Sequence, residues 1–449
     1  MNQTLIKVRA IVTMDSDRRF LENGGILLSG NTIERVLTGN EMKELNGFQG
    51  EVIDVPKLVA IPGFVQTHIH LCQTIFRGLA DDLELLDWLK LRIFPYEAAH
   101  NEQSMYISSR LGIAELIRAG TTTIMDMGSV NHEDQVVRAI DESGLRAFVG
   151  KAMMDENDIY PSLKESTKVS LSSALKQAEQ WHNTCDGRVL YAVAPRFVLS
   201  CTETLLREAY EMTKGFPGML FHSHAAENRH ELEAVRRNCK MDNVEYFDRI
   251  GVLQSNTCLA HCIWLSDNEV NLLRQREAKV LHCPSANMKL GSGIARVPEF
   301  LSKGVTVSLG ADGAPCNNRL DMFEEMRLAA LIQKPLHGPR ATNAQTMFEM
   351  ATLGGAKTLG LEREIGSIEA GKKADLVLLD VARVWNPSVD STADSVYSSI
   401  VYSCSPENVR SVLVNGKWLY KDGVHTTLDE EQVVCAAQKE LRRLLDRVE

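Results

Sequence analysis

Sequence features that would direct a protein to a membrane, to secretion or to nucleic acid are absent from this chain of 449 residues. No uninterrupted apolar run approaches the roughly 18 residues that a membrane span needs. Residues 1–17 contain neither an apolar core nor a small-residue cleavage site, so we expect no secretory signal. The net charge is −10 and no block of lysine and arginine occurs, so the sequence predicts no nucleic-acid partner.

Two further motifs are missing. The ten cysteines form no Cys-x-x-Cys pair, and Cys258, Cys262 and Cys283 lie in apolar runs, where a reduced cysteine behaves as a small hydrophobic residue. We therefore expect a reduced, cytoplasmic protein. No Gly-x-Gly-x-x-Gly turn follows a predicted strand, which disfavours an open, doubly wound nucleotide-binding sheet.

What the sequence does contain is a regular alternation of short apolar runs and amphipathic helical stretches between about residues 60 and 360. This alternation predicts parallel strands joined by crossover helices, and eight such units are the number of a (β/α)8 TIM-type barrel. The eight runs lie within residues 58–71, 121–127, 146–154, 188–197, 218–226, 257–265, 279–287 and 305–313.

The two ends of the chain have a different pattern. Residues 1–58 and residues 366–426 both contain short strands separated by turn signals, and neither has enough strand to close a domain alone. We therefore predict one small composite β-sandwich domain built from both ends, with the barrel spanning residues 59–365. Residues 427–449 predict a terminal amphipathic helix.

His68 and His70 are the most informative local signal. They end the first barrel run, and residues two apart in a strand point to the same side. Two imidazoles at the carboxyl end of a barrel strand suit Zn²⁺ or a similar ion. Taken alone, the pair could also be two solvated histidines at a strand end.

Later runs end in the same kind of residue, and barrel active sites lie at the carboxyl ends of the strands. This repetition favours a metal site over isolated histidines. The residues concerned are His222, His224 and Glu227 after the fifth run, His261 in the sixth, His282 in the seventh and Asp312 at the end of the eighth.

Five segments together resemble the amidohydrolase superfamily: PGFVQTHIH, SHAAE, AHC, HCPSANMKLGSG and GADGAPCNN. The similarity is greatest to its branch of purine deaminases, which includes the 5'-methylthioadenosine/S-adenosylhomocysteine deaminases, and it covers nearly the whole chain. The resemblance implies metal ligation by His68, His70, His224 and Asp312. Glu227 follows His224 at the family's ligand-plus-acid spacing, so His222 is expected to be structural.

The resemblance also implies one divalent ion, zinc as the first expectation, with iron or manganese left open. Relatives with two metals bridge them with a modified lysine on the fourth strand, which here ends at Arg196. The ion lowers the pKa of a bound water. Asp312 is expected to hold that water and accept its proton, Glu227 to protonate a ring nitrogen, and His261 to stabilise the developing charge.

The expected substrate is an adenine nucleoside: 5'-deoxyadenosine, 5'-methylthioadenosine, S-adenosylhomocysteine or adenosine. The segment FRGLADDLELLDWL resembles a loop in which the position of Asp87 contacts ribose, and Trp88 is expected to pack on the sugar or base. Lys151 and Arg196 replace an arginine and a histidine of the subgroup, which argues against a large amino-acid tail. The stretch from Asp312 onward is most similar to 5'-deoxyadenosine deaminases.

Three alternatives stay open. A guanine, 8-oxoguanine or pterin deaminase would use Arg196 to bind a ring carbonyl. A triazine hydrolase would expel chloride or an amine, and Cys316 lies at a position that varies with the leaving group in such enzymes. A metal-free scaffold protein is the third. We also expect a homo-oligomer, no membrane partner, and a polar loop at residues 156–170 that closes over substrate.

Overall fold

The computed structural model describes residues 3–43, 45, 47–382 and 393–448. The chain divides into two compact units. The first comprises Met1–Val65, Ala114–Thr123 and Asp321–Leu428, and the second comprises Gln66–Ile113, Ile124–Leu320 and Asp429–Glu449. Among the described residues, no helix combines the length and apolar character needed to cross a membrane.

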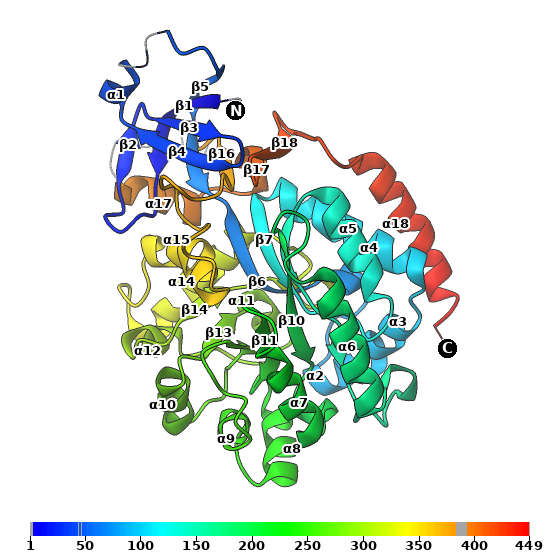
Figure 1. Ribbon diagram of the computed structural model, residues 1–449. Coiled ribbons are helices and arrows are strands. Elements are labelled where there is room, and N and C mark those ends of the chain that lie inside the picture. The colour runs from blue at the N-terminus through cyan, green and yellow to red at the C-terminus, as the bar shows by residue number, and fades with distance from the viewer. Residues whose placement is uncertain (1–2, 44, 46, 383–392, 449) are drawn as a thin grey trace. The chain divides into compact units, whose positions relative to one another are not determined.

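A parallel sheet forms the barrel, in the order β14-β13-β12-β11-β10-β8-β7-β6-β15, with β9 paired to β10 (Figure 1). Each of the eight predicted runs contains one of its main strands, so the predicted (β/α)8 barrel is confirmed. The strands are β6 (Phe64–His70), β7 (Thr121–Asp126), β8 (Arg146–Val149), β9 (Ala152–Met153), β10 (Val189–Pro195), β11 (Leu220–Ala225), β12 (Thr257–His261), β13 (Lys279–His282), β14 (Val307–Leu309) and β15 (Asp312–Gly313).

The barrel closes between its first and last strands. β14 pairs with β13, and after two residues β15 pairs in parallel with β6, which brings Asp312 opposite Ile69. Gly310 permits this approach, because a Cβ there would lie 2.7 Å from the carbonyl oxygen of His68. The strands β6, β7, β8 and β12 are buried along their whole length, as expected for continuous apolar runs in a parallel sheet.

Helices follow most barrel strands, and several begin at a side-chain cap. Ser166, Thr202, Asn228 and Ser266 each accept a backbone N–H of the first turn. The helices between residues 71 and 358 are η1 (Leu71–Phe76), α2 (Leu85–Trp88), η2 (Leu89–Ile93), α3 (Phe94–Ala98), α4 (Glu102–Arg118), α5 (Glu133–Ser143), η3 (Pro161–Leu163), α6 (Thr167–Trp181), η4 (Val198–Ser200), α7 (Glu203–Thr213), α8 (Arg229–Cys239), α9 (Asn243–Arg249), α10 (Asp267–Gln275), α11 (Pro284–Lys289), α12 (Val297–Ser302), α13 (Ala314–Asn317), α14 (Met322–His337), α15 (Ala344–Ala351) and α16 (Leu353–Thr358).

Both chain ends build a second, nine-stranded sheet. β5 pairs antiparallel with β16, with Pro62 opposite Leu376, and this pairing joins the N-terminal strands to the C-terminal ones. Its members are β1 (Gln3–Val12), β2 (Phe20–Glu22), β3 (Gly25–Ser29), β4 (Thr32–Leu37), β5 (Glu51–Pro62), β16 (Leu376–Leu379), β17 (Val409–Val414), β18 (Lys417–Lys421) and β19 (Val424–His425). The remaining helices are α1 (Gly39–Lys43), α17 (Ala393–Tyr402), η5 (Pro406–Asn408) and α18 (Glu430–Leu445), the last of which packs Leu444 against Ile75 and Phe76.

Candidate active site

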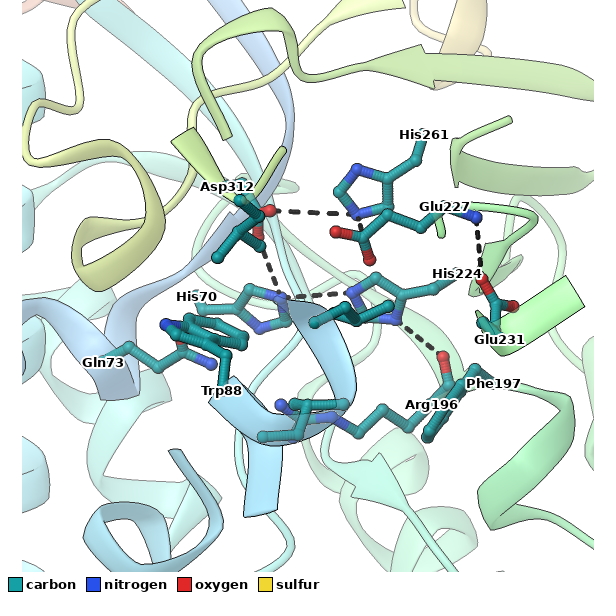
Figure 2. Close-up of a pocket in the computed structure, with 13 residues that line it drawn as sticks. His70, Gln73, Trp88, Arg196, Phe197, His224, Glu227, Glu231, His261 and Asp312 are labelled. Carbon is teal, nitrogen blue, oxygen red and sulfur yellow. Dashed lines mark hydrogen bonds and ion pairs between the residues drawn. The ribbon is translucent and has the colours of Figure 1, made fainter. Parts of the chain in front are cut away.

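Four side chains that could hold a metal ion come together at the carboxyl ends of barrel strands. His68 and His70 lie two residues apart on one face of β6, His224 lies on β11, and Asp312 lies on β15. Their ligand atoms are all within 4.8 Å of one another. Figure 2 shows His70, His224 and Asp312 turned toward a common point.

The hydrogen bonds of His70 and His224 direct two ring nitrogens at each other. Nδ1 of His70 donates to the carbonyl oxygen of Met127, and Nδ1 of His224 donates to that of Arg196, each over 2.7 Å. Burial lowers the pKa of His70 to about 3 and that of His224 well below its usual value, so both rings are neutral near pH 7. Their Nε2 atoms therefore carry lone pairs, yet they lie only 3.3 Å apart.

A cation explains this contact between two acceptors. Nitrogen ligands at about 2.0–2.1 Å from zinc would lie roughly 3.3 Å apart in a tetrahedral site. His68 fits the same arrangement, because its buried Nε2 has no hydrogen-bond partner among the described residues and lies 3.4 Å from Oδ1 of Asp312. Three imidazole nitrogens and one carboxylate form a donor set that fits a single divalent cation of the zinc type.

Asp312 supplies the negative charge of this group. Burial opposes its ionisation, but the adjacent imidazoles, first that of His68 and then those of His261 and His70, outweigh that effect and hold the pKa of Asp312 well below its usual range. The carboxylate is therefore ionised near neutral pH, as a metal ligand or a proton acceptor requires.

His222 orients His68 from behind. Nδ1 of His68 and Nε2 of His222 share a hydrogen bond of 2.7 Å, and the two rings meet edge to face. With its proton on Nδ1, His68 donates to His222 and presents an unprotonated Nε2 to a metal. The His-x-His pattern of the fifth strand was the sequence signal for this contact, since both histidines of the pattern project toward the barrel interior.

Glu227 and His261 form an acid–base pair beside Asp312. Oε2 of Glu227 lies 3.4 Å from Nε2 of His261, which lies 3.8 Å from Oδ2 of Asp312 (Figure 2). Burial raises the pKa of Glu227 to about 7. Burial also disfavours a charged His261, but the carboxylates of Glu227 and Asp312 outweigh it and raise the pKa of His261. Glu227 can therefore exchange a proton near neutrality, and the two carboxylates favour the charged form of His261.

Residues outside the predicted set fix these two side chains. Nδ1 of His261 lies 2.8 Å from Oδ1 of Asn287, and Ser292 Oγ donates to Oε1 of Glu227 over 3.3 Å. The backbone N–H of Glu227 donates to Glu231, a residue of the capping box that begins α8. Asn287 and Ser292 belong to the segment HCPSANMKLGSG and were not predicted as site residues from the sequence.

Two residues of the site have backbone angles that L-residues seldom adopt. His261 has φ of 70° and Asp312 has φ of 61°, both in the left-handed region. Such a conformation costs about 1–3 kcal/mol and persists where the surrounding structure imposes it. His261 is the last residue of β12, and Asp312 is the first residue of the two-residue strand β15.

The pocket around these residues is narrow in this conformation. Its cavity volume is about 20 Å³, whereas sites for larger organic ligands are typically about 300–1,000 Å³. Leu85, Trp88 and Leu89, from α2 and the start of the π-helix η2, form the apolar part of its wall. The remaining lining residues are His70, Gln73, Arg196, Phe197, His224, Glu227, Glu231, His261, Leu290 and Asp312.

The side chain of Arg196 reaches this pocket but is bound to a carboxylate. Its Nη1 and Nη2 donate to Oε2 and Oε1 of Glu97 over 2.8 and 3.1 Å, and both side chains are almost fully buried. Gln73 donates to the same carboxylate over 2.8 Å. Sequence reasoning did not find Glu97 or Gln73, because neither lies in a motif that was interpreted.

Of the predicted substrate-binding residues, Asp87, Lys151 and Cys316 do not line the pocket, whereas Trp88, Arg196, Glu227 and His261 do. Asp87 is exposed on α2. Lys151 is buried and pairs with Glu165, and it also donates to Ser173 over 2.9 Å. Cys316 is buried in an apolar cluster with Trp88 and is not part of the pocket wall.

The segment at residues 156–170, expected to be a mobile lid, is held at several points. The backbone N–H of Glu165 donates to the carbonyl of Met154, and that of Glu156 to Ser200. Next to the segment, the carboxylate of Asp155 accepts from the hydroxyls of Thr167 and Thr202. None of its residues lines the pocket just described.

Comparison with known proteins gives the family. The model of the amidohydrolase family matches residues 59–419. The chain belongs to this family. A 5'-deoxyadenosine deaminase of Methanothermobacter thermautotrophicus is 39% identical, over 93% of this chain and 94% of its own length. A 5-methylthioadenosine/S-adenosylhomocysteine deaminase of Moorella thermoacetica is 37% identical, over 88% and 90% of the two chains.

One solved structure has a similar fold and contains a bound metal ion. The crystal structure of an adenosine deaminase from Xanthomonas campestris with bound zinc superposes with a TM-score of 0.92 at 27% sequence identity. The alignment covers 99% of each chain. The family membership and the barrel expected from the sequence are confirmed, and a metal-dependent hydrolase is the class that these relatives support.

Proposed function

We propose that this amidohydrolase removes the amino group of an adenine nucleoside by hydrolysis, releasing ammonia and the corresponding inosine analogue. The observation that carries the proposal is the placement of Glu227, a buried carboxyl with a pKa of about 7, beside His261 and the metal-ligand group. The names of the relatives, which are deaminases of 5'-deoxyadenosine and of 5-methylthioadenosine/S-adenosylhomocysteine, support the same reaction.

We propose His68, His70, His224 and Asp312 as the ligands of one zinc ion. A divalent ion in such a site lowers the pKa of bound water and so supplies the nucleophile near neutral pH. Zinc is favoured over iron or manganese by the imidazole-rich donor set and by the bound zinc in the related adenosine deaminase structure.

The chain's own groups would move the protons. Asp312 accepts a proton from the attacking water, because its carboxylate is ionised and lies among the ligand atoms. Glu227 donates its proton to the ring nitrogen next to the carbon under attack and is later returned to its acid form. His261, oriented by Asn287, donates a hydrogen bond to the oxygen that is added to the ring. The amino group takes the proton held by Asp312 and leaves as ammonia, and the hydroxyl proton of the added oxygen goes to Glu227 and restores its acid form.

The 5' substituent is proposed to be small. Lys151 is only 2% exposed and its ammonium is occupied by Glu165 and Ser173, so it is not presented to an anionic tail. The alternative of a guanine-type deaminase depended on Arg196 binding a ring carbonyl. The ion pair of Arg196 with Glu97 weighs against that alternative.

Ammonia release from a substrate panel tests the proposal. Zinc-loaded protein should act on 5'-deoxyadenosine, 5'-methylthioadenosine and adenosine with higher kcat/KM than on guanine or ammeline, and metal analysis should find about one ion per chain. Release from guanine with none from the adenine nucleosides would overturn the substrate class. Full activity in metal-free protein would overturn the mechanism.

A further inference from the structure

Trp264 is a half-buried residue that takes no part in the reaction steps proposed above. It follows β12, three residues after His261, and its backbone N–H donates to the carbonyl oxygen of Ala226 over 3.0 Å. Its indole Nε1–H donates to the backbone carbonyl oxygen of Ser292 over 2.8 Å. A tryptophan in such a position usually finds a partner for this N–H, and here the partner belongs to a turn that also contacts the acid–base pair.

The turn at residues 287–293, at the end of α11, folds back on itself. The backbone N–H of Ser292 donates to the carbonyl oxygen of Asn287 over 2.9 Å, so both backbone polar groups of Ser292 are bound. Gly293 lets the turn lie against the indole, because its φ is 133° and a Cβ there would lie 2.8 Å from the ring of Trp264. With its backbone held and its side chain buried, Ser292 has little freedom beyond the rotation of that side chain.

The same turn contacts both members of the acid–base pair. Ser292 Oγ donates to Oε1 of Glu227 over 3.3 Å, and Oδ1 of Asn287 lies 2.8 Å from Nδ1 of His261. Oε2 of Glu227 lies instead 3.4 Å from Nε2 of His261. The two oxygens of this carboxyl group therefore have different partners: Oε1 accepts from a hydroxyl, and Oε2 faces an imidazole.

The Ser292 hydroxyl affects Glu227 in both of its protonation states. A protonated carboxyl group carries its proton on one oxygen, and since Oε1 accepts the Ser292 O–H, that proton lies on Oε2. Burial raises the pKa of Glu227 to about 7, and the hydrogen bond from Ser292 acts in the opposite direction. The hydroxyl therefore also stabilises the carboxylate that remains after the proton has been transferred.

We propose that Trp264 is a positioning residue for the catalytic acid: by binding the carbonyl of Ser292, it keeps the Ser292 hydroxyl on Oε1 of Glu227 and leaves Oε2 to carry the transferred proton. Arg229 supports the indole, with its guanidinium 4.1 Å from the ring centroid. Arg229 begins α8 two residues after Glu227, so these contacts form a closed ring that returns to the acid. The inference rests on the proposed function, because it names what positions the acid of that reaction.

A double-mutant cycle on zinc-loaded protein tests the proposal. Trp264→Phe keeps a ring next to Arg229 and removes the N–H, whereas Ser292→Ala removes the hydroxyl. Ser292→Ala should lower kcat for 5'-deoxyadenosine about tenfold with KM within about twofold of wild type, and Trp264→Phe should lower kcat about threefold. The double variant should be no slower than Ser292→Ala, because Trp264 acts through the hydroxyl. Trp181→Phe, which loses an indole hydrogen bond to Asp134, is the matched control and should behave as wild type.

The pH profile supplies a readout that a loss of packing alone would not move. Without the hydroxyl, ionised Glu227 lacks one hydrogen bond, so the pH at which kcat/KM falls should rise by about one unit in Ser292→Ala and by less in Trp264→Phe. Wild-type kcat and pH profile in Trp264→Phe would overturn the proposal. The same holds if Trp264→Phe causes its full loss again in the Ser292→Ala background.

A second variant covers the case in which Trp264→Phe does not fold. Gly293→Ala keeps every hydrogen-bonding side chain but places a methyl group against the indole, which displaces the turn. Its pH profile should move in the same direction as that of Ser292→Ala, and an unmoved profile in folded protein would overturn the proposal.

A measurement without substrate separates this inference from the proposed function. In zinc-loaded wild type, the NMR resonance of the Trp264 indole N–H, identified by its loss in Trp264→Phe, should shift as the pH is raised through about 7, where Glu227 ionises. The shift should be absent in Ser292→Ala. A resonance that does not move in wild type, or that moves equally in Ser292→Ala, would overturn the proposal. If wild type releases no ammonia from 5'-deoxyadenosine, the proposed function fails, whereas the NMR result still decides whether Trp264 is coupled to Glu227.

Discussion

Glu227 is a buried carboxyl whose pKa burial raises to about 7, which lets it hold a proton under neutral conditions. The protonated form is the one the proposed reaction uses, so kcat/KM should fall as the pH rises through about 7. Glu227→Gln keeps the shape but transfers no proton, and we expect a loss of about 10²–10⁴-fold in kcat/KM together with this limb of the pH profile. Initial rates of ammonia release measure both, and wild-type rates in a zinc-replete variant would contradict the role.

His222 contacts His68 and is not itself among the metal-ligand group. Its removal should leave four ligands present but His68 poorly oriented. We expect His222→Ala to weaken zinc binding by about 10–100-fold, the usual effect of losing such a supporting contact. Competition with a chelator measures the affinity, and His337→Ala, at an exposed histidine, is the control. Equal affinities in the two variants would show that His222 does not orient His68.

Residues could be predicted from the sequence where strand geometry alone brings them together. His68 and His70 share a face of one strand, and His224 and Asp312 lie near the carboxyl ends of the fifth and eighth predicted runs. Glu97 could not be predicted in this way, because its partner Arg196 is 99 residues away and the pairing depends on how α3 lies relative to the residue that follows β10. A buried ion pair of this kind has no local sequence pattern.

Helix α2 shows a different limit of sequence reasoning. Asp87 and Trp88 were both expected to contact substrate, but adjacent residues of a helix point about 100° apart. Trp88 is 4% exposed and lines the pocket, so Asp87 faces solvent. The run of eight strands was predictable because continuous apolar segments of the right length recur, whereas the phase of a four-residue helix is set by its neighbours.

We expect the segment from Leu85 to Ile93, made of α2 and the π-helix η2, to move when a purine enters. Its side chains Leu85, Trp88 and Leu89 line the cavity of about 20 Å³, and π-helical turns are frequent at functional sites. We expect hydrogen exchange in this segment to slow when an inosine analogue binds. Residues 156–170, tied by Lys151 and Asp155, should change much less. The reverse pattern would identify that loop as the lid.

At the scale of the whole molecule, metal binding should contribute to stability as well as to catalysis. Removing the ion leaves buried imidazole lone pairs facing each other across 3.3 Å. An ion held at 1,000 times its Kd stabilises the folded state by about 4 kcal/mol. We expect a chelator to lower Tm by several degrees and added zinc to restore it, as measured by thermal unfolding. A Tm indifferent to the chelator, in protein shown to have lost its metal, would contradict the proposed site.

The closure of the barrel through β15 has a consequence for how the enzyme is held together. In the described part of the chain, two residues, Asp312 and Gly313, pair the end of the sheet with its beginning at Ile69 and His70. An ion bound by His68, His70 and Asp312 would cross-link β6 and β15, and so hold the first strand of the barrel to the last. The same ligand atoms would then serve both barrel closure and catalysis. A substitution that weakens metal binding would therefore also weaken the closure of the barrel.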